Sequence, residues 1–383
     1  MQANNRPVAV RSAESSSRVL ALDALRGAIM VLMALDHANH FIAHKHPPGE
    51  IWDGVFPVYY DALTFLTRLV THLAPAGFFL LLGAGMALFA HRRREQGWSE
   101  WRIVGHFGLR ALVLIAVQLL IVNRAWELSP EGWGIRIYWG VLCALGCTMV
   151  LGSLLLRLPA PYLLGIGVAL LIGIEFTHPG VGMWHEVSHT PVEVIWLYPG
   201  GDANLWVYYP ILPWLELVVL GMAFGKWVLV APKQAFHRAW QIGLMCLAAF
   251  VAVRALDGFG NVRPRMGNSW IDFLNVVKYP PSLAYTLLTT GVNLCFLSLF
   301  AWLGERIQRL LQPLVVFGRA PLFFYVLHLF LYAGIGRLVA PKGSSILAML
   351  PFWLLGLTIL FPLCWLYGWL RHKPGWNVVL RYV

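Results

Sequence analysis

The sequence predicts an all-α, polytopic membrane protein with about ten transmembrane helices and both termini in the cytoplasm. Two observations carry this prediction: 58% of the 383 residues are hydrophobic, and only 12% are charged. An average soluble domain has about 25% charged residues, so this chain has roughly half the charge that a water-facing surface needs. The composition excludes an ordinary cytosolic enzyme, a disordered protein and a nucleic-acid-binding protein, and we expect the lipid bilayer as a partner.

Ten apolar runs follow one another along the chain, and we interpret each as one span of about 20 residues. They cover residues 19–42, 62–90, 103–122, 137–156, 160–176, 209–231, 239–256, 282–303, 314–336 and 346–370. The first run is too long, and too often interrupted by polar residues, for a cleaved signal peptide, so we expect an uncleaved first span. The chain then divides into a cytoplasmic tail (1–18), a membrane domain (19–371) and a second cytoplasmic tail (372–383).

Basic residues set the orientation, because Lys and Arg collect on cytoplasmic loops. With the N-terminus in the cytoplasm, sixteen of the 29 Lys and Arg residues fall on the cytoplasmic side, nine on the outer side and four within or beside spans. The net charge of +11 therefore reflects topology, and we expect a multi-pass protein of the bacterial cytoplasmic (inner) membrane. A homo-oligomer is a further candidate assembly.

The loop between the seventh and eighth spans departs from this pattern. It places Arg254, Arg263, Arg265 and Lys278 on the outer side. Three interpretations stay open: a long exposed loop, a misplaced span, or a binding site for an anionic or polar substrate. The five cysteines lie in apolar runs without metal-ligand spacing, so we expect buried packing residues and no metal site.

Ionisable groups inside spans cost roughly 2.5–3.5 kcal/mol each on insertion scales, which makes them functional candidates. The first span concentrates them in Asp23, Arg26, Asp36, His37 and His40. Asp23 and Arg26 are three residues apart and can form an ion pair. Either this pair only neutralises the two charges, or it also takes part in ligand binding. Asp36, His37 and His40 lie near the outer end, where a carboxylate beside an imidazole provides a general base.

Other spans contribute Arg68, His72, Glu216, Arg319 and His328. Arg68 and His72 are four residues apart on one helix and are expected to line the same cavity. Glu216 is a candidate partner for an intramembrane arginine. Arg319 and His328 flank Tyr325 in the run FGRAPLFFYVLHLF, and Arg319 either binds a ligand or extends to the cytoplasmic interface.

Residues 185–189 read HEVSH, which fits the zinc-binding pattern H-E-x-x-H. Zinc binding by this pattern requires both histidines on one helical face. Pro179 and two glycines precede it and Pro191 follows it, so a stable helix is not expected. We interpret the match as chance in a histidine-containing outer loop.

The chain resembles membrane acyltransferases that modify sugars. Arg26, ten further residues and His37 match the arginine-x10-histidine motif of the large acyltransferase family acting on cell-surface glycans, and ALDHANHF is closer to bacterial proteins grouped with heparan-alpha-glucosaminide N-acetyltransferase. The stretches that carry the resemblance, in order, are RVLALDALRGAIMVLMALDH, TRLVTHLAPAGFFLLLGAG, YPILPWLELVVLGMAFG, KYPPSLAYTLLTTG and FGRAPLFFYVLHLFLY. They extend from residue 18 to residue 332.

The resemblance implies transfer of an acyl group from cytosolic acetyl-CoA, as co-substrate, to a sugar or glycan acceptor across the membrane. It places His37 at the catalytic histidine and Arg26 at the motif arginine. Residue types extend this set: Asp36 would orient His37, while His72 and Arg68 would stabilise an oxyanion or hold the acceptor. Candidate binding residues are Asp23, His40, Arg68, Lys278, Arg319, Tyr325 and His328.

Two questions stay open at this point. His37 acts either as general base or as acyl carrier, and His40, His44, His46 and His72 are alternative bases. A different class of protein, a transporter coupled to protons through Asp36, His37 and His40, also fits these residues. Transporters commonly show repeated halves, and this sequence shows no internal repeat.

Overall fold

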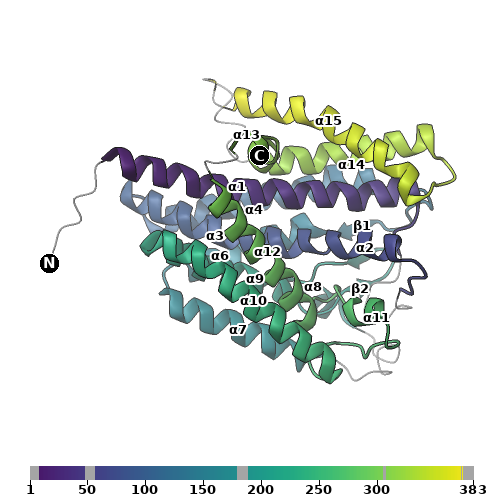
Figure 1. Ribbon diagram of the computed structural model, residues 1–383, viewed down its shortest axis with the longest axis horizontal. Helices are drawn as coiled ribbons and strands as arrows, with labels where there is room; N and C mark the ends of the chain where they lie inside the picture. Colours follow the sequence, from purple (N-terminus) through teal and green to yellow (C-terminus); the bar gives the residue numbers. More distant parts are fainter. Residues whose placement is uncertain (1–7, 48–56, 179–188, 305–307, 372, 374–383) are drawn as a thin grey trace.

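The computed structural model describes residues 8–47, 57–178, 189–304, 308–371 and 373, with side chains from Leu20 onward apart from residue 308. Most helices lie along one long axis, with the N-terminus at one end of the bundle (Figure 1). The long helices are α1 (Val8–Ala38), α3 (Leu73–Glu95), α4 (Glu100–Val117), α6 (Val141–Leu155), α7 (Ala160–Glu175), α9 (Ile211–Val230), α10 (Pro232–Leu256), α12 (Leu283–Leu303), α14 (Pro321–Val339) and α15 (Ile346–Leu370).

Seven described helical segments are long and apolar enough to cross a membrane. They are α2–α3 (Ala62–Glu95), α4–α5 (Glu100–Trp126), α9, α10, α12, α14 and α15. Helices α6 and α7 are apolar but have only 15 and 16 residues. Helix α1 is long, but its apolar part, from Val19 onward, contains three charged residues, Asp23, Arg26 and Asp36. The protein is therefore a multi-pass, predominantly α-helical membrane protein, while the count of ten spans and the cytoplasmic termini stay predictions.

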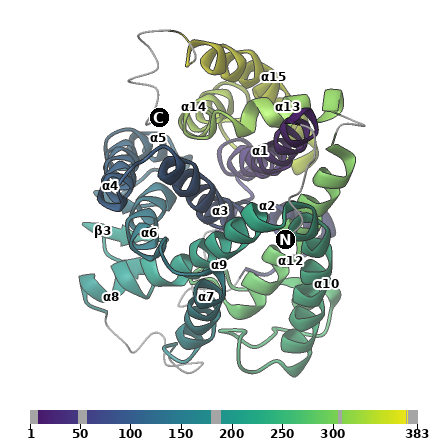
Figure 2. The ribbon, with the colours of Figure 1, turned by 90° about the vertical axis from the view of Figure 1, so that its left-hand side faces the viewer.

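Helix α1 lies inside the bundle and contacts α2, α3, α12, α13 (Gln308–Gly318), α14 and α15. The view along the bundle shows α13, α14 and α15 beside α1 on one side, with α10 and α12 in another group (Figure 2). In this central position the polar groups of α1 face other helices of the bundle, which lowers the cost of placing charged residues among apolar helices.

Two of the long spans contain local changes of helical geometry close to the same end of the bundle. Helix α1 continues into the π-helical turn η1 (Asn39–Ala43), which ends at His44 with φ 56°. Helix α4 continues into the π-helical turn η2 (Gln118–Val122) and then α5 (Asn123–Trp126). Such π turns widen the helix and re-aim side chains, frequently at functional sites.

The predicted span 62–90 is interrupted between α2 (Ala62–Thr71) and α3. Pro75 has no N–H and disfavours the regular helical contact with the carbonyl of Thr71. The two following carbonyls receive side-chain donors instead: Tyr285 Oη donates to His72 O at 2.8 Å, and Asn293 Nδ2 donates to Leu73 O at 3.0 Å. Helix α12 thus supports the break.

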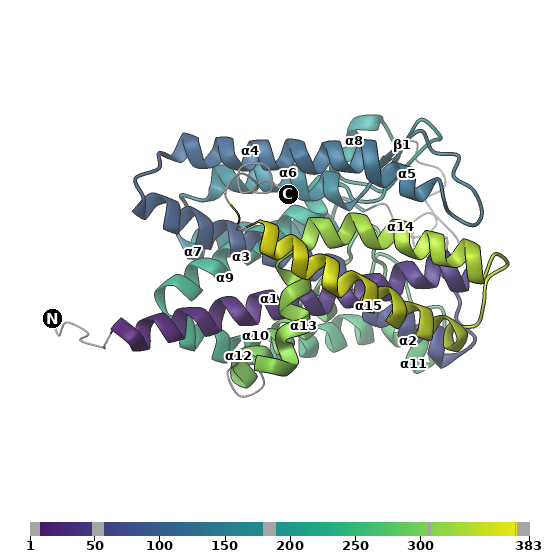
Figure 3. The same cartoon turned by 90° about the horizontal axis from the view of Figure 1, so that it is seen from above.

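One sequence prediction is wrong in part, because the run 137–156 does not begin as a helix. Ile137–Trp139 forms strand β1, which pairs in parallel with β3 (Leu205–Val207); β3 pairs antiparallel with β2 (Gly200–Gly201). The residues are aromatic and β-branched, which favours a strand, and Gly140 then begins α6. The sheet and the short helices α8 (Pro191–Trp196) and α11 (Trp270–Leu274) gather at the end opposite the N-terminus (Figures 1 and 3).

Helices α3 and α9 pack with their backbones close together. A Cβ atom at Gly83 would lie 1.9 Å from Val218 O, and one at Gly221 would lie 2.1 Å from Leu80 O. The same close approach joins η1 to α14, where a Cβ at Gly336 would lie 2.0 Å from Phe41 O. Small residues of this kind allow membrane helices to gain van der Waals contact in the absence of a hydrophobic driving force.

We predict that Gly83→Leu destabilises the protein by about 1–3 kcal/mol or more, because the new side chain meets fixed backbone atoms of α9. Gly85→Leu is the matched control, since a Cβ at Gly85 of the same helix has nothing within 4 Å. The thermal unfolding midpoint of the detergent-purified protein measures the difference. Equal midpoints for the two variants would contradict the close α3–α9 packing.

Candidate active site

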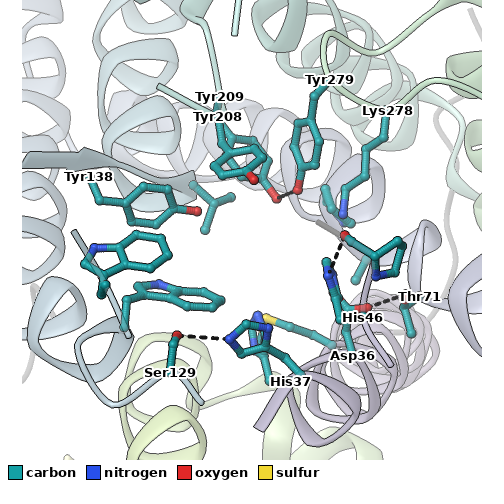
Figure 4. Close-up of a pocket in the computed structure, with 18 of the residues that line it drawn as sticks. Asp36, His37, His46, Thr71, Ser129, Tyr138, Tyr208, Tyr209, Lys278 and Tyr279 are labelled. Atoms are coloured by element: carbon teal, nitrogen blue, oxygen red, sulfur yellow. Dashed lines mark hydrogen bonds and ion pairs between the residues drawn. The ribbon is translucent and has the colours of Figure 1, made fainter. Parts of the chain in front are cut away.

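A cavity of about 230 Å³ lies at the end of the bundle opposite the N-terminus. Figure 4 shows its walls: His37 and Ser129 on one side, Tyr208, Tyr209 and Tyr279 facing them, and Tyr138 across from Lys278 and His46. The lining residues come from six parts of the chain: 33–47, 71–78, 126–141, 208–209, 278–279 and Tyr325. The cavity therefore collects polar and aromatic side chains that are distant in sequence.

His37 is positioned by His328 of α14. His37 Nδ1 lies 2.6 Å from His328 Nε2, and His328 Nδ1 lies 2.9 Å from the carbonyl oxygen of Phe324. A carbonyl oxygen only accepts, so His328 Nδ1 carries the hydrogen, and a neutral His328 then offers Nε2 as an acceptor. We infer that His37 donates from Nδ1, which leaves the lone pair of its Nε2 free for chemistry.

Asp36 does not take the role that the sequence suggested for it. Its carboxylate is bound by Arg68 and by Thr71 Oγ1, which donates to Asp36 Oδ1 at 2.8 Å. His46 Nε2 lies 3.7 Å from Asp36 Oδ2. Neighbouring residues on a helix do not face each other, so Asp36 and His37 point to different surroundings. His328, rather than Asp36, orients His37.

The other histidines of this region have their own partners. His40 Nε2 lies 3.0 Å from Ser129 Oγ, and the π turn places His40 near Trp126, with 5.2 Å between ring centroids. His44 Nε2 contacts Phe41 O at 3.3 Å, and His46 Nδ1 contacts Pro47 O at 3.1 Å. His40, His44 and His46 all line the cavity, so the loop after α1 contributes to the site as well as the helix.

The wall facing the histidines is built from tyrosines and one cation. Tyr209 Oη and Tyr279 Oη form a hydrogen bond of 2.9 Å. Lys278 is 3% exposed, and its Nζ lies 4.8 Å from the centre of the Tyr279 ring. Lys278 and Tyr325, both proposed from the sequence as binding residues, do line the cavity.

Arg68 and His72 are close to the site but do not line the cavity. Arg68 is 1% exposed and forms an ion pair with Asp36, which itself lines the cavity. His72 ends α2, and its ring lies edge-on to Tyr285 with 5.7 Å between centroids. Both lie behind the residues that line the cavity, so the expectation that Arg68 and His72 line one cavity together is wrong.

Asp23, Arg26 and Arg319 form a separate group nearer the N-terminal end of α1. Arg26 Nη1 donates to Asp23 Oδ1 at 2.9 Å and to Gly318 O at 3.0 Å, and Arg319 Nε donates to Asp23 Oδ2 at 3.1 Å. His37 lies eleven positions after Arg26 along the helix, which corresponds to roughly 17 Å at 1.5 Å per residue. The structure thus separates the two motif residues that the sequence placed together in one site.

Two further arginines lie beside this group. Arg371 Nη1 contacts Arg319 O at 3.5 Å, and Arg110 of α4 is within electrostatic range of Arg26 and Arg371. Among the described residues, Arg26 and Arg319 bind the carboxylate of Asp23, while Arg110 and Arg371 add positive charge next to them. We call Arg26, Arg110, Arg319 and Arg371 the arginine cluster.

Two other candidates from the sequence, Arg254 and Glu216, have structural partners. Arg254 donates to Phe273 O, Asp272 O and Asn261 Oδ1, so it fixes the loop after α10 rather than facing a substrate. Glu216 accepts from Thr286 Oγ1 at 3.0 Å, and no arginine is its recorded partner within the described residues. The HEVSH motif lies outside the described residues except for His189.

Sequence reasoning missed the aromatic side of the cavity. Trp126, Trp133 and Tyr138 line it, together with Ser129 and Glu131. These residues belong to a span end and the following loop, where aromatic residues are expected as interface anchors. The signal that distinguishes them is the close spacing of aromatic residues between Trp126 and Trp139, next to Pro130, Gly132 and Gly134.

Comparison with known proteins agrees with the resemblance noted from the motifs. Residues 18–256, more than half the chain, match the family described as heparan-alpha-glucosaminide N-acetyltransferase, catalytic. Over 142 residues the chain is 25% identical to human (Homo sapiens) heparan-alpha-glucosaminide N-acetyltransferase, a match that covers 37% of this chain and 19% of the human protein. His37, Asp36 and Trp126 all fall inside the family match. The chain belongs to the heparan-alpha-glucosaminide N-acetyltransferase catalytic family.

Proposed function

We propose that this protein moves an acetyl group from acetyl-CoA to a sugar acceptor, with His37 as the reacting base. The single observation that carries the proposal is the His37–His328–Phe324 hydrogen-bond chain at the cavity wall. It supplies an imidazole with a defined tautomer and a free Nε2, which is what proton abstraction requires. The family assignment supports the acyltransferase class.

The proposed reaction uses His37 twice. His37 Nε2 takes a proton from the amine or hydroxyl of the acceptor while that atom attacks the thioester carbonyl. The tetrahedral intermediate collapses, the carbon–sulfur bond breaks, and the imidazolium returns the proton to the leaving thiolate of coenzyme A. The same free Nε2 would allow a second route, in which His37 attacks the thioester and carries the acetyl group before passing it on.

Lys278 is the cation best placed to stabilise the developing oxyanion. Of the cations proposed from the sequence, it is the one that lines the cavity, whereas Arg68 is held by Asp36. An ammonium in a largely buried site interacts more strongly with a developing negative charge than it would in water. The paired hydroxyls of Tyr209 and Tyr279 lie next to it and add polar contacts for the acceptor.

The arginine cluster is the proposed site for the phosphates of acetyl-CoA. It has an excess of positive charge, and guanidinium groups bind phosphates through charge-assisted hydrogen bonds. The pantetheine arm of coenzyme A is long, and the separation of roughly 17 Å along α1 gives it room to place its thioester near His37. This arrangement matches a donor that enters from the N-terminal, cytoplasmic end and an acceptor that binds at the other end.

The transporter hypothesis receives less support. Its proton-carrying residues were Asp36, His37 and His40, but Asp36 is held by Arg68 and Thr71. The family match is to an acetyltransferase catalytic region. A rise in the thermal unfolding midpoint of the purified protein on addition of acetyl-CoA would favour the enzyme. Transport of substrate into liposomes without an acyl donor would favour the transporter.

We predict that His37→Ala lowers acetyl transfer to glucosamine at least 10³-fold, because the imidazole whose tautomer is fixed by His328 is removed from the cavity wall. His91→Ala is the control, since His91 lies at the exposed end of α3 and pairs with Glu95. Transfer from radiolabelled acetyl-CoA in proteoliposomes measures the effect. Wild-type rates in His37→Ala would move the reacting base to His40, His44 or His46.

We predict that His328→Leu lowers kcat by about 10²-fold, because His37 loses the acceptor that fixes its tautomer. His328→Gln should recover part of the rate, since its amide oxygen can still accept from Nδ1. The KM for acetyl-CoA should stay the same in both variants. Equal kcat values for Leu and Gln at this position would show that His328 does not orient His37.

We predict that Arg319→Gln raises the KM for acetyl-CoA several-fold with little change in kcat, because one phosphate partner is lost. The effect should shrink as salt is added, since Arg319 is 57% exposed on its side chain and is screened. Arg337→Gln, at the exposed far end of α14, is the matched control. A KM for acetyl-CoA equal to that of the control would remove the arginine cluster from the donor site.

A further inference from the structure

Trp126, Trp133 and Tyr138 form an aromatic group on one side of the cavity, which we call the aromatic box. We propose that the aromatic box binds the pyranose ring of the acceptor sugar and presents it to His37. This inference rests on the proposed function, because it identifies the acceptor of that same site. It assigns the two tryptophans as binding residues.

The aromatic box is a packed unit that reaches the reacting base. Trp126 and Trp133 are stacked, with 5.6 Å between ring centroids and 25° between planes. Tyr138 stands edge-on to both, at 5.8 Å from Trp126 and 5.2 Å from Trp133. Trp126 in turn lies 5.5 Å from the ring of His37 and 5.2 Å from that of His40. A ligand against the box therefore meets the catalytic histidine.

The indole N–H groups of the box are unsatisfied. Trp126 Nε1 and Trp133 Nε1 are buried, and neither has a hydrogen-bond partner in the part of the chain that the structure describes. Buried polar groups in native proteins are nearly always hydrogen-bonded, so two unpartnered donors beside one cavity indicate a ligand with acceptors. Sugar hydroxyls are acceptors of this kind.

The backbone that carries the aromatic box is held by hydrogen bonds to strand β3 and to the side chain of Asn123. Tyr138 lies on β1, in register with Trp206 of β3. The side chain of Asn123, on α5, bonds both the backbone N and O of Tyr138 at 3.2 Å in the orientation that satisfies its amide. Helix α5, which carries Trp126, is thereby attached to the strand that carries Tyr138. The box is preformed, which limits the ordering cost of binding.

The chemistry of the wall favours a sugar over a purely apolar ligand. Aromatic faces supply flat apolar area, while the indole N–H groups, Ser129 and the tyrosine hydroxyls supply polar contacts at its edges. A pyranose has the matching form, with an apolar C–H face and a rim of hydroxyls. Glu131 also lines the cavity and suits an acceptor that carries an amino group. The wall therefore suits both the ring and an amino group of the sugar acceptor in the proposed function, and the inference assigns the residues that hold that ring.

Equilibrium binding of radiolabelled glucosamine to the His37→Ala protein tests the inference without turnover. We expect Trp133→Leu in that background to weaken binding at least tenfold, and Trp133→Phe, which keeps a ring but loses the N–H, to lie between. Trp101→Leu is the matched control, because Trp101 is 77% exposed at the start of α4. Acetyl-CoA binding, measured in parallel, should be the same in all of these variants.

The outcomes separate the inference from the function on which it rests. Unchanged glucosamine binding in Trp133→Leu would overturn the inference, and so would weakened binding of acetyl-CoA, which would place its adenine ring in the box instead. Ethanolamine serves as a ringless amine: binding as tight as that of glucosamine would also overturn it. If glucosamine binding depends on Trp133 but the wild-type protein transfers no acetyl group, the aromatic box stands and the proposed function fails.

Discussion

The arrangement of this protein depends on partners for the ionisable groups of α1 between Asp23 and His37. Helix α1 takes Asp23, Arg26, Asp36 and His37 through the middle of an apolar bundle. Uncompensated charges there would cost several kcal/mol each. The neighbouring helices supply Arg319, Arg68 and His328, and these pairings fix α13, α2 and α14 against α1. The contacts that lower the energetic cost of the charged groups in α1 are thus the same contacts that position the residues of the candidate site.

These pairings divide α1 into two functional halves. Near its N-terminal end, one carboxylate is shared among an excess of arginines, which suits a multiply charged donor. Near its C-terminal end, the cations Arg68 and Lys278 lie close to Asp36, and the cavity is otherwise lined by aromatic and hydroxyl groups, which suits a sugar. Close backbone packing holds both halves: Gly27 and Gly318 join α1 to α13, and Gly336 joins η1 to α14. Chemistry is proposed in the C-terminal half, at His37.

Composition and apolar runs were enough to predict a multi-pass helical membrane protein, because hydrophobicity is a local property of the chain. They did not predict the π turns, the break at His72 or the small sheet, which depend on contacts from other helices. Within the site, His37, Lys278 and Tyr325 were found as polar or aromatic residues in unusual places. The partner of His37 was assigned wrongly, since spacing along one helix says nothing of α14, 291 residues away.

The candidate histidines differ in whether their hydrogen bonds leave a ring nitrogen with a lone pair free to accept a proton. Both His44 and His46 contact a carbonyl oxygen, so each must donate from that nitrogen, and the remaining nitrogen of His46 faces the carboxylate of Asp36. The geometry of His46 therefore suits a partner of Asp36 better than a base with a free nitrogen facing the acceptor. His72 does not line the cavity. His37 combines a fixed tautomer, a free Nε2 and a place in the cavity wall, so hydrogen bonding, rather than position in a motif, supports it as the base.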